Sequence, residues 1–393
     1  MLEIAIIFVM NNVPFSIIFD IGTTTIDTFF EYFYHNQKFL QRKSVLNCQR
    51  KFGHDVISRM HSIERDIQNQ KKMSILIKQQ CLSLIEEFVK ENFSEDISFE
   101  IQQVIFVGNT IEMHLLTDTE TSGMWQFPFT PKKYFNEHYY FSDFFSDALI
   151  SSHFKKRILT KNTDVFLPQC LDAFIGSDSL LGFYYCFSLC QKSFCFIDIG
   201  TNAEFFLYDT KTVYYTSVAA GPAFERNLLY KGVTGSELVD QLAELKKRGI
   251  LQSDGLLFGG FKDSTEIVSK NQEKIVLTQN IIRQLQLAKA AIHAGIKTLF
   301  FESKCTLAQI DTFYISGAFG NALNTENALA IVLFPKISKS SFHCIDSTVF
   351  EGTQLLLQNK NVFDSFLKQR KFFHVDLAQN EYFAQEYILA MDF

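Results

Sequence analysis

The sequence predicts an α/β fold made of two lobes, because one motif and one order of elements each occur twice. An apolar run ends in Asp-Ile-Gly-Thr at residues 20–23, and a second apolar run ends in the same four residues at 198–201. An apolar run that meets a glycine is typical of a buried strand entering a tight turn. Each half also repeats the order strand, glycine turn, strand, strand, helix, which is typical of α/β lobes with ligands bound between them.

Chain length supports the same division. The chain has 393 residues, which is more than one hydrophobic core usually serves. No linker rich in Pro, Gly or Ser separates the halves, so the boundary is set at the second motif. We expect a leader at residues 1–14, a first lobe at 15–192 and a second lobe at 193–393.

The individual elements follow from apolar periodicity and turn residues. In the first half we expect, in order, paired strands within 15–34, helical residues over about 54–92, a strand at 104–107, a helix at 111–117, irregular chain with short strands at 122–165, and a helix at 172–190. In the second half we expect strands at 194–199, 203–208, 212–218, 312–315 and 342–346, and helices at 236–249, 278–300, 352–359 and 380–391.

Composition excludes several classes of partner. The net charge of −6 gives no basic field for nucleic acid. The apolar stretch at residues 1–10 is interrupted by Glu3 and is too short to span a bilayer or to serve as a good signal peptide. We therefore expect a cytoplasmic protein with no nucleic acid and no membrane partner.

The two Asp-Ile-Gly-Thr turns are the candidate ligand site. Glycine lets backbone N–H groups approach an anion, and hydroxyl and amide side chains add further donors. Two such turns facing each other would hold a polyphosphate from both sides. The expected donors are Gly22, Thr23, Thr24 and Thr25 in the first turn and Gly200, Thr201 and Asn202 in the second. The alternative is that both aspartates merely form turns and the threonines are ordinary strand residues.

Other residues allow both a functional and a structural interpretation. Cys186, Cys190 and Cys195 form a C-x3-C-x4-C cluster, which matches no zinc or ferredoxin spacing. Buried thiols are the better interpretation, so no intrinsic iron–sulfur cluster is expected. His114 is expected to be a satisfied histidine rather than a metal ligand. The apolar stripe within residues 284–292 is expected to be a core helix, and only Gln286 and Lys289 on it are candidates to reach the cleft between the lobes.

The motifs together resemble those of the ASKHA superfamily, which includes sugar kinases, heat-shock chaperones and actin. A third glycine turn, Ser316-Gly317-Ala318-Phe319-Gly320-Asn321, completes the set. The resemblance implies a two-lobed, actin-like or ribonuclease H-like ATPase fold with an interlobe nucleotide cleft. It implies that residues 20–25 are a first phosphate loop and residues 198–202 a second phosphate loop. The third turn would then bind adenosine through Gly317, Ala318 and Phe319.

Longer sequence blocks narrow the resemblance. Residues 47–49, 53–59, 107–116, 198–204, 219–225 and 283–292 resemble, in the same order, blocks of the ATPase domain of the reductive activators of corrinoid proteins. The resemblance implies ATP and Mg²⁺ as cofactors, with the metal held through water by Asp20 and Asp198. Either carboxylate, or Glu204, would orient the attacking water. Gly221 and Pro222 form a further turn assigned to nucleotide binding.

Two departures from that family affect the expected partners. These activators usually carry a ferredoxin domain with a C-x4-C-x2-C run, and this sequence has no such run. We therefore expect a corrinoid protein and a separate ferredoxin-like electron donor as partners, with a homodimer as a further prediction. Arg226-Asn227 also stands where the family would have small residues. The alternatives are a small-molecule kinase with the same clamp and a nucleotide-gated binding protein that does not hydrolyse ATP.

One group of polar residues remains to be explained. Asp55, Arg59, Asn109 and Thr110 occur within otherwise apolar blocks of the first lobe, so they need hydrogen-bond partners or water. They would either couple the phosphate loops to a docking surface or cap helices and hold the lobe together internally.

Overall fold

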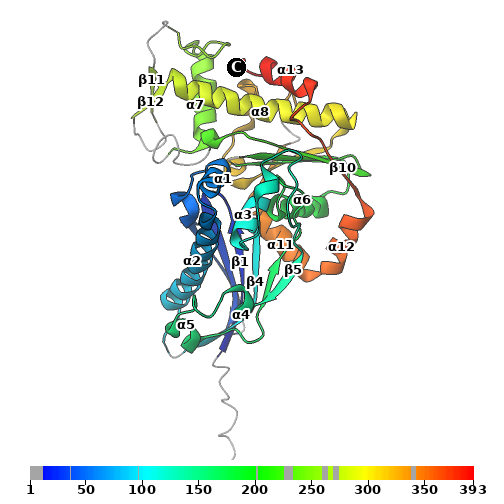
Figure 1. Ribbon diagram of the computed structural model, residues 1–393. Coiled ribbons are helices and arrows are strands. Elements are labelled where there is room, and N and C mark those ends of the chain that lie inside the picture. Colours follow the sequence, from blue (N-terminus) through cyan, green and yellow to red (C-terminus); the bar gives the residue numbers. More distant parts are fainter. Residues whose placement is uncertain are drawn as a thin grey trace, which may run out of the picture. The chain divides into compact units, whose positions relative to one another are not determined.

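The computed structural model describes residues 12–35, 37–95, 97–200, 202–224, 233–258, 264–268, 274–337 and 342–393. The chain forms two compact units, Met1–Leu180 and Leu181–Phe393, and each has its own sheet and hydrophobic core. Figure 1 shows the chain coloured from its N-terminus to its C-terminus, and helix α6 (Ser177–Leu189) contains the boundary between the units. None of the described helices is long and apolar enough to cross a membrane.

The first unit is built on a mixed sheet whose main path runs β3-β2-β1-β4-β7-β5, with β6 paired to β4. Strands β1, β2 and β3 form an antiparallel meander, and β4 runs parallel to β1. The strands are β1 (Asn12–Ile21), β2 (Thr25–Tyr34), β3 (Gln37–Leu46), β4 (Ser98–Gly108), β5 (Glu137–Tyr140), β6 (Ile158–Leu159) and β7 (Asp164–Leu167).

Alternating apolar residues of β1 and β2 are buried against helix α2, as expected for one face of a pleated strand. The Phe88 ring of α2 stacks on Phe30 with centroids 3.9 Å apart and lies 6.4 Å from Phe15. The helices of this unit are α1 (Val56–Arg65), α2 (Gln68–Asn92), α3 (Thr110–Leu116), α4 (Phe141–Phe144) and α5 (Ser152–Arg157), with the 3₁₀ turns η1 (Cys48–Lys51) and η2 (Ser122–Met124).

The second unit has a sheet of order β14-β13-β8-β9-β10-β15. Strands β8, β9 and β10 form a meander, and β13 runs parallel to β8. The strands are β8 (Phe194–Ile199), β9 (Ala203–Tyr208), β10 (Thr212–Val218), β13 (Thr312–Ser316), β14 (Phe342–Ile345) and β15 (Lys371–His374), and β11 (Ser264–Val268) pairs separately with β12 (Lys274–Thr278).

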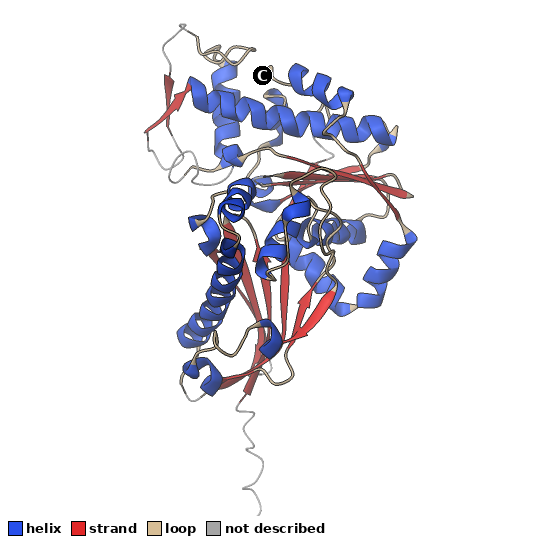
Figure 2. Ribbon diagram, in the orientation of Figure 1, coloured by secondary structure: helices blue, strands red, loops and turns tan. Residues whose placement is uncertain are grey.

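Helices cover both faces of this second sheet (Figure 2). On one face, a Cβ atom at Gly295 of α8 would lie 2.7 Å from the Phe205 ring, so glycine permits close packing. On the other face, Phe183 of α6 stacks on Phe206 at 4.8 Å. The helices are α7 (Gly235–Lys247), α8 (Gln279–Ser303), α9 (Gly317–Asn321), α10 (Thr325–Ala330), α11 (Thr348–Gln358), α12 (Lys360–Gln369) and α13 (Glu381–Leu389), with the 3₁₀ turns η3 (Pro222–Phe224) and η4 (Leu307–Gln309).

The two sheets share one topology, which confirms the repeated element order. The order β3-β2-β1-β4-β7 in the first unit corresponds to β10-β9-β8-β13-β14 in the second. In both, a three-stranded antiparallel meander is extended by strands parallel to its first strand. The two Asp-Ile-Gly-Thr motifs therefore end equivalent strands, β1 and β8.

Several element boundaries differ from the predicted ones for local reasons. The helical stretch expected at 54–92 is broken because Asp66 has an extended backbone and its carboxylate accepts a hydrogen bond from the Gln68 N–H, which starts a new helix. Helix α6 begins at Ser177 rather than near 172, because the Asp172 carboxylate accepts from the N–H groups of Phe174 and Ile175 and forms a turn.

Candidate functional site

The turn predicted to be the first phosphate loop, and called so below, connects β1 to β2. Asp20 lies near the end of β1, opposite Asp27 of β2 and beside Val107 of β4. Gly22 follows the strand, and a Cβ atom there would lie only 2.9 Å from the Thr25 carbonyl oxygen. This turn is therefore too tight for a larger residue. The following residue, Thr23, is buried, with 8% of its surface exposed.

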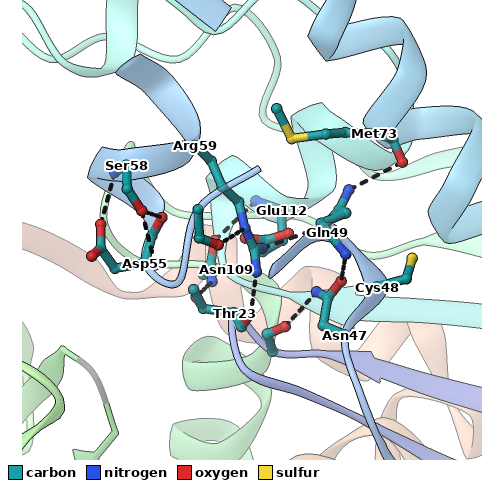
Figure 3. A network of polar contacts seen from close by, with 12 residues as sticks. Thr23, Asn47, Cys48, Gln49, Asp55, Ser58, Arg59, Met73, Asn109 and Glu112 are labelled. Carbon is teal, nitrogen blue, oxygen red and sulfur yellow. Dashed lines mark hydrogen bonds and ion pairs between the residues drawn. The ribbon is translucent and has the colours of Figure 1, made fainter. Parts of the chain in front are cut away.

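A buried polar network, here called the loop brace, holds this turn from within the unit (Figure 3). Its members are Asn47, Gln49, Arg59, Asn109 and Glu112. The Asn47 side chain donates to the Gly22 carbonyl at 2.9 Å, and the Asn47 N–H donates to the Thr24 carbonyl at 2.9 Å. Arg59 donates to the Thr23 carbonyl that lies between them. Three successive carbonyls of the loop are thus fixed by two residues.

Arg59 is the centre of the loop brace. Its side chain is completely buried, and it forms an ion pair with Glu112, which is also completely buried. It also donates to the Gly53 carbonyl at 3.2 Å and to the Gln49 side chain at 3.4 Å. Burial raises the pKa of Glu112 above its usual value, and the nearby charge of Arg59 offsets only part of this rise. A buried ion of either sign is tolerated only when it is paired in this way.

The polar residues that sequence analysis left open serve internal roles. Asp55 caps helix α1 and accepts from the Ser58 N–H at 2.7 Å. Asn109 caps α3, and its amide donates to the Thr23 hydroxyl at 3.2 Å. Thr110 donates to the carbonyls of Asp172 and Ile175. These contacts cap helices and join parts of the unit, and Arg59 and Asn109 in addition donate to the carbonyl and the hydroxyl of Thr23.

Asp178 is a carboxylate near this site that sequence analysis missed. A Cβ atom at Gly176 would lie 2.3 Å from the Asn109 Cα and 2.6 Å from the Asp178 Oδ1, so glycine lets the two approach. Asp178 is in the first turn of α6, and burial raises its pKa to about 6. In the sequence, Asp178 is marked only by the run Gly-Ser-Asp at the start of a helix, and such runs are too common to indicate a functional residue.

The turn predicted to be the second phosphate loop, and called so below, connects β8 to β9. The Gly200 N–H donates to the Asn202 carbonyl at 2.8 Å, which closes the turn; Thr201 lies outside the described residues. Asp198 is opposite Glu204 of β9 and beside Ser316 of β13. The structure therefore brings Asp198 and Glu204 together as a cross-strand pair.

The third glycine turn lies beside Asp198. Gly317 has a φ of +86°, and a Cβ atom there would lie 3.2 Å from the Asp198 Oδ1. The Phe319 ring is buried and lies 5.3 Å from the Phe224 ring. Gly221 has a φ of +73° and precedes Pro222, the first residue of η3. The side chains of Ala318 and Pro222 lie outside the described part.

Other candidates from the sequence have structural roles. His114 bonds through Nδ1 to the Thr110 carbonyl at 2.7 Å and accepts at Nε2 from the Lys133 N–H, and burial lowers its pKa, so the neutral ring is favoured. Lys289 is completely buried within the second unit and donates to the carbonyls of Ala390 and Asp392, both at 2.6 Å.

The cysteine cluster contains two buried thiols. Cys186 and Cys195 are fully buried, and burial raises the pKa of both. Cys190 is half-buried. Across the residues that the structure describes, no group of three or more His, Cys, Asp or Glu side chains is arranged to hold a metal ion.

Comparisons with known proteins agree on one family. The family model described as the C-terminal domain of RACo, the ASKHA domain, matches residues 192–229 and 226–393, and the model described as the RACo middle region matches residues 15–187. The corrinoid activation enzyme RamQ of Eubacterium limosum is 26% identical over 434 residues, covering 95% of this chain and 70% of RamQ.

A solved structure gives the same result for the fold. A reductive activator for corrinoid, iron–sulfur protein superposes with a TM-score of 0.80 at 24% identity, covering 98% of this chain. This chain spans 66% of the length of that activator. The superposition shows the fold, and the family models, which match residues 15–187 and most of 192–393, show that the chain belongs to the RACo family and has its ASKHA domain.

Proposed function

We propose that this chain binds and hydrolyses ATP with Mg²⁺ and uses the nucleotide cycle to activate a corrinoid protein. The observation that carries the proposal is the presence of Asp-Ile-Gly-Thr at equivalent strand ends of two sheets with one topology. Membership of the RACo family supports the choice of activity, as do the names of RamQ and of the solved activator. The electron donor is proposed to be a separate ferredoxin-like protein.

The residues present suit magnesium and a nucleotide. Asp20 and Asp198 are half-buried carboxylates at the ends of equivalent strands. Mg²⁺ prefers one or two carboxylates, water and phosphate oxygens. When bound, the metal neutralises charge on the phosphate oxygens. Gly317 keeps the space beside the Asp198 carboxylate free of a side chain, since a Cβ atom there would lie 3.2 Å from the Asp198 Oδ1.

The remaining roles fall to this chain's own groups. The backbone N–H groups and the hydroxyls of the two phosphate loops would donate to the phosphate oxygens of one ATP. Glu204, paired across the ladder with Asp198, would orient the attacking water together with that aspartate. Catalysis would rest mainly on positioning and charge stabilisation, as in other phosphoryl transfers.

Nucleotide binding is proposed to act on the corrinoid partner through linkage. Reduction of a cobalt centre at low potential is unfavourable by itself. When a protein binds two states of its partner with different affinities, it shifts the equilibrium between those two states. The size of the shift equals the difference between the two binding free energies. If ATP selects the state of this chain that binds the partner in its reducible form, reduction becomes more favourable.

The test is a pair of assays on the full chain. With MgATP and no acceptor, steady release of phosphate is expected, and Asp198→Asn should abolish it. With a corrinoid protein and an electron donor, cobalt reduction followed by absorbance should be faster with ATP than with ADP. Transfer of the phosphate to a sugar or acid would instead indicate a kinase, and binding without release would indicate a nucleotide-gated module.

A further inference from the structure

The loop brace fixes the direction of successive peptide groups in the first phosphate loop. The carbonyls of Gly22, Thr23 and Thr24 accept hydrogen bonds from the Asn47 side chain, Arg59 and the Asn47 N–H in turn. In a planar trans peptide the C=O and the N–H of the next residue point in opposite directions. The N–H groups of residues 23–25 are therefore directed away from the brace. Successive N–H groups aligned in this way form an anion-binding concavity.

The Thr23 hydroxyl is fixed by the same network. Its oxygen accepts from the Asn109 amide at 3.2 Å, which leaves its own proton to be donated elsewhere. Asn109 is also the N-cap of α3, where its side-chain oxygen accepts from the Glu112 N–H at 2.9 Å. One helix start thus orients both the Thr23 hydroxyl and the carboxylate that holds Arg59.

Arg59 occupies a position that no other residue type would fill. It uses the Nε group and both terminal nitrogens to reach Gly53, Gln49, Glu112 and Thr23. A guanidinium presents five donors in a rigid fork, whereas a lysine ammonium is a single point charge. The other carboxylate oxygen of Glu112, Oε2, is buried and has no hydrogen-bond partner among the described residues. A buried ion pair kept with an unsatisfied oxygen is costly for folding, which favours a role beyond stability.

We propose that Arg59, held by Glu112, is a positioning residue that orients the first phosphate loop for the phosphates of the nucleotide. This inference rests on the proposed binding of ATP. Arg59 is completely buried, so it acts through the Thr23 carbonyl and not by touching the ligand. Its loss should therefore weaken binding of phosphates and leave binding of the nucleoside nearly unchanged.

The test compares MgATP with adenosine, which lacks phosphates, in Arg59→Lys. Dissociation constants are measured by calorimetry on the full chain. MgATP binding is expected to weaken by about tenfold or more, the effect of losing one oriented charge-assisted contact, while adenosine binding changes by less than about twofold. Equal weakening of both ligands, or unchanged MgATP binding, would overturn the proposal.

Arg157 supplies a matched control. It is a buried arginine of the same unit that also donates to backbone carbonyls, and among the described residues its hydrogen bonds go to Ser94 and Ile97 rather than to the phosphate loop. Arg157→Lys should lower stability in a similar way and leave the ratio of the MgATP and adenosine affinities as in the wild type. If Arg157→Lys changed the ratio of the two affinities as much as Arg59→Lys does, the effect of Arg59→Lys would be purely structural.

Two further measurements keep the test decisive. Glu112→Gln keeps Arg59 but removes the charge that orients it, and it should change the ratio in the same direction. If neither variant folds, hydrogen exchange of the wild type is used: MgATP, but not adenosine, should slow exchange of the amides of residues 23–25, and no slowing overturns the proposal. A wild type that binds neither ligand would refute the proposed function itself.

Discussion

Substitution of Gly317 by alanine isolates the contact between the third glycine turn and Asp198. The φ of Gly317 is +86°, a backbone conformation that costs an L-residue about 1–2 kcal/mol. The added Cβ would lie 3.2 Å from the Asp198 Oδ1, so the carboxylate must move by a few tenths of an ångström. Gly317→Ala should therefore lower the free energy of unfolding by about 1–2 kcal/mol. Because Asp198 is proposed to hold Mg²⁺ through water, MgATP binding should also weaken by about tenfold, or about 1.4 kcal/mol.

Gly249 allows these two effects to be separated. Its φ is +69°, and a Cβ atom there would meet nothing within 4 Å. Gly249→Ala should therefore cost a similar free energy of unfolding, measured by urea denaturation, without touching the site. Calorimetry should find weaker MgATP binding only in Gly317→Ala. Equal MgATP affinity in the two variants would refute the reasoning about Asp198.

Three further predictions concern buried ionisable groups and the cysteines. Burial raises the pKa of Asp178 to about 6, so ionisation opposes folding as the pH rises from about 4 to 6, by at most about 3 kcal/mol. Urea denaturation should show this decrease in the free energy of unfolding in the wild type and not in Asp178→Asn. The same pH dependence of the free energy of unfolding in both proteins would argue against the raised pKa. Burial lowers the pKa of Lys289 to about 7, so the wild type should lose stability relative to Lys289→Met as the pH falls from about 10 to 7. A difference in the free energy of unfolding between the wild type and Lys289→Met that does not depend on pH would contradict this prediction. Anaerobically purified chain should contain no stoichiometric iron or sulfide, and iron that is lost in Cys195→Ser would contradict the interpretation of that residue as a buried thiol.

The sheets and their loops could be predicted from sequence because their signals are local. Each Asp-Ile-Gly-Thr motif joins a buried strand to a turn within eight or so residues. The repeat of that pattern then indicated the common topology of the two units. The hairpin β11–β12 and strand β15 are short and gave no comparable signal. Helix α12 was also missed, although its buried residues Phe363 and Phe366 recur at helical spacing.

The loop brace could not be derived from the sequence because its contacts are long-range. Arg59 and Glu112 are 53 residues apart, and Arg59 and Thr23 are 36 residues apart. Sequence reasoning showed only that polar residues in apolar blocks need partners. It could not show that those partners include the phosphate loop. Lys289 illustrates the converse: its place on a helix was predictable, but its contacts with the carbonyls of Ala390 and Asp392 depend on where the distant chain packs.

The most direct test of the account is calorimetric titration of the chain with ATP in the presence of Mg²⁺. The account predicts saturable binding to one site, which also raises the melting temperature because the ligand binds only the folded state. It further predicts that Asp20→Ala and Asp198→Ala, one change in each phosphate loop, each weaken this binding. Absence of a binding signal from the wild type at millimolar ATP would contradict the central claim that the two phosphate loops bind a nucleotide.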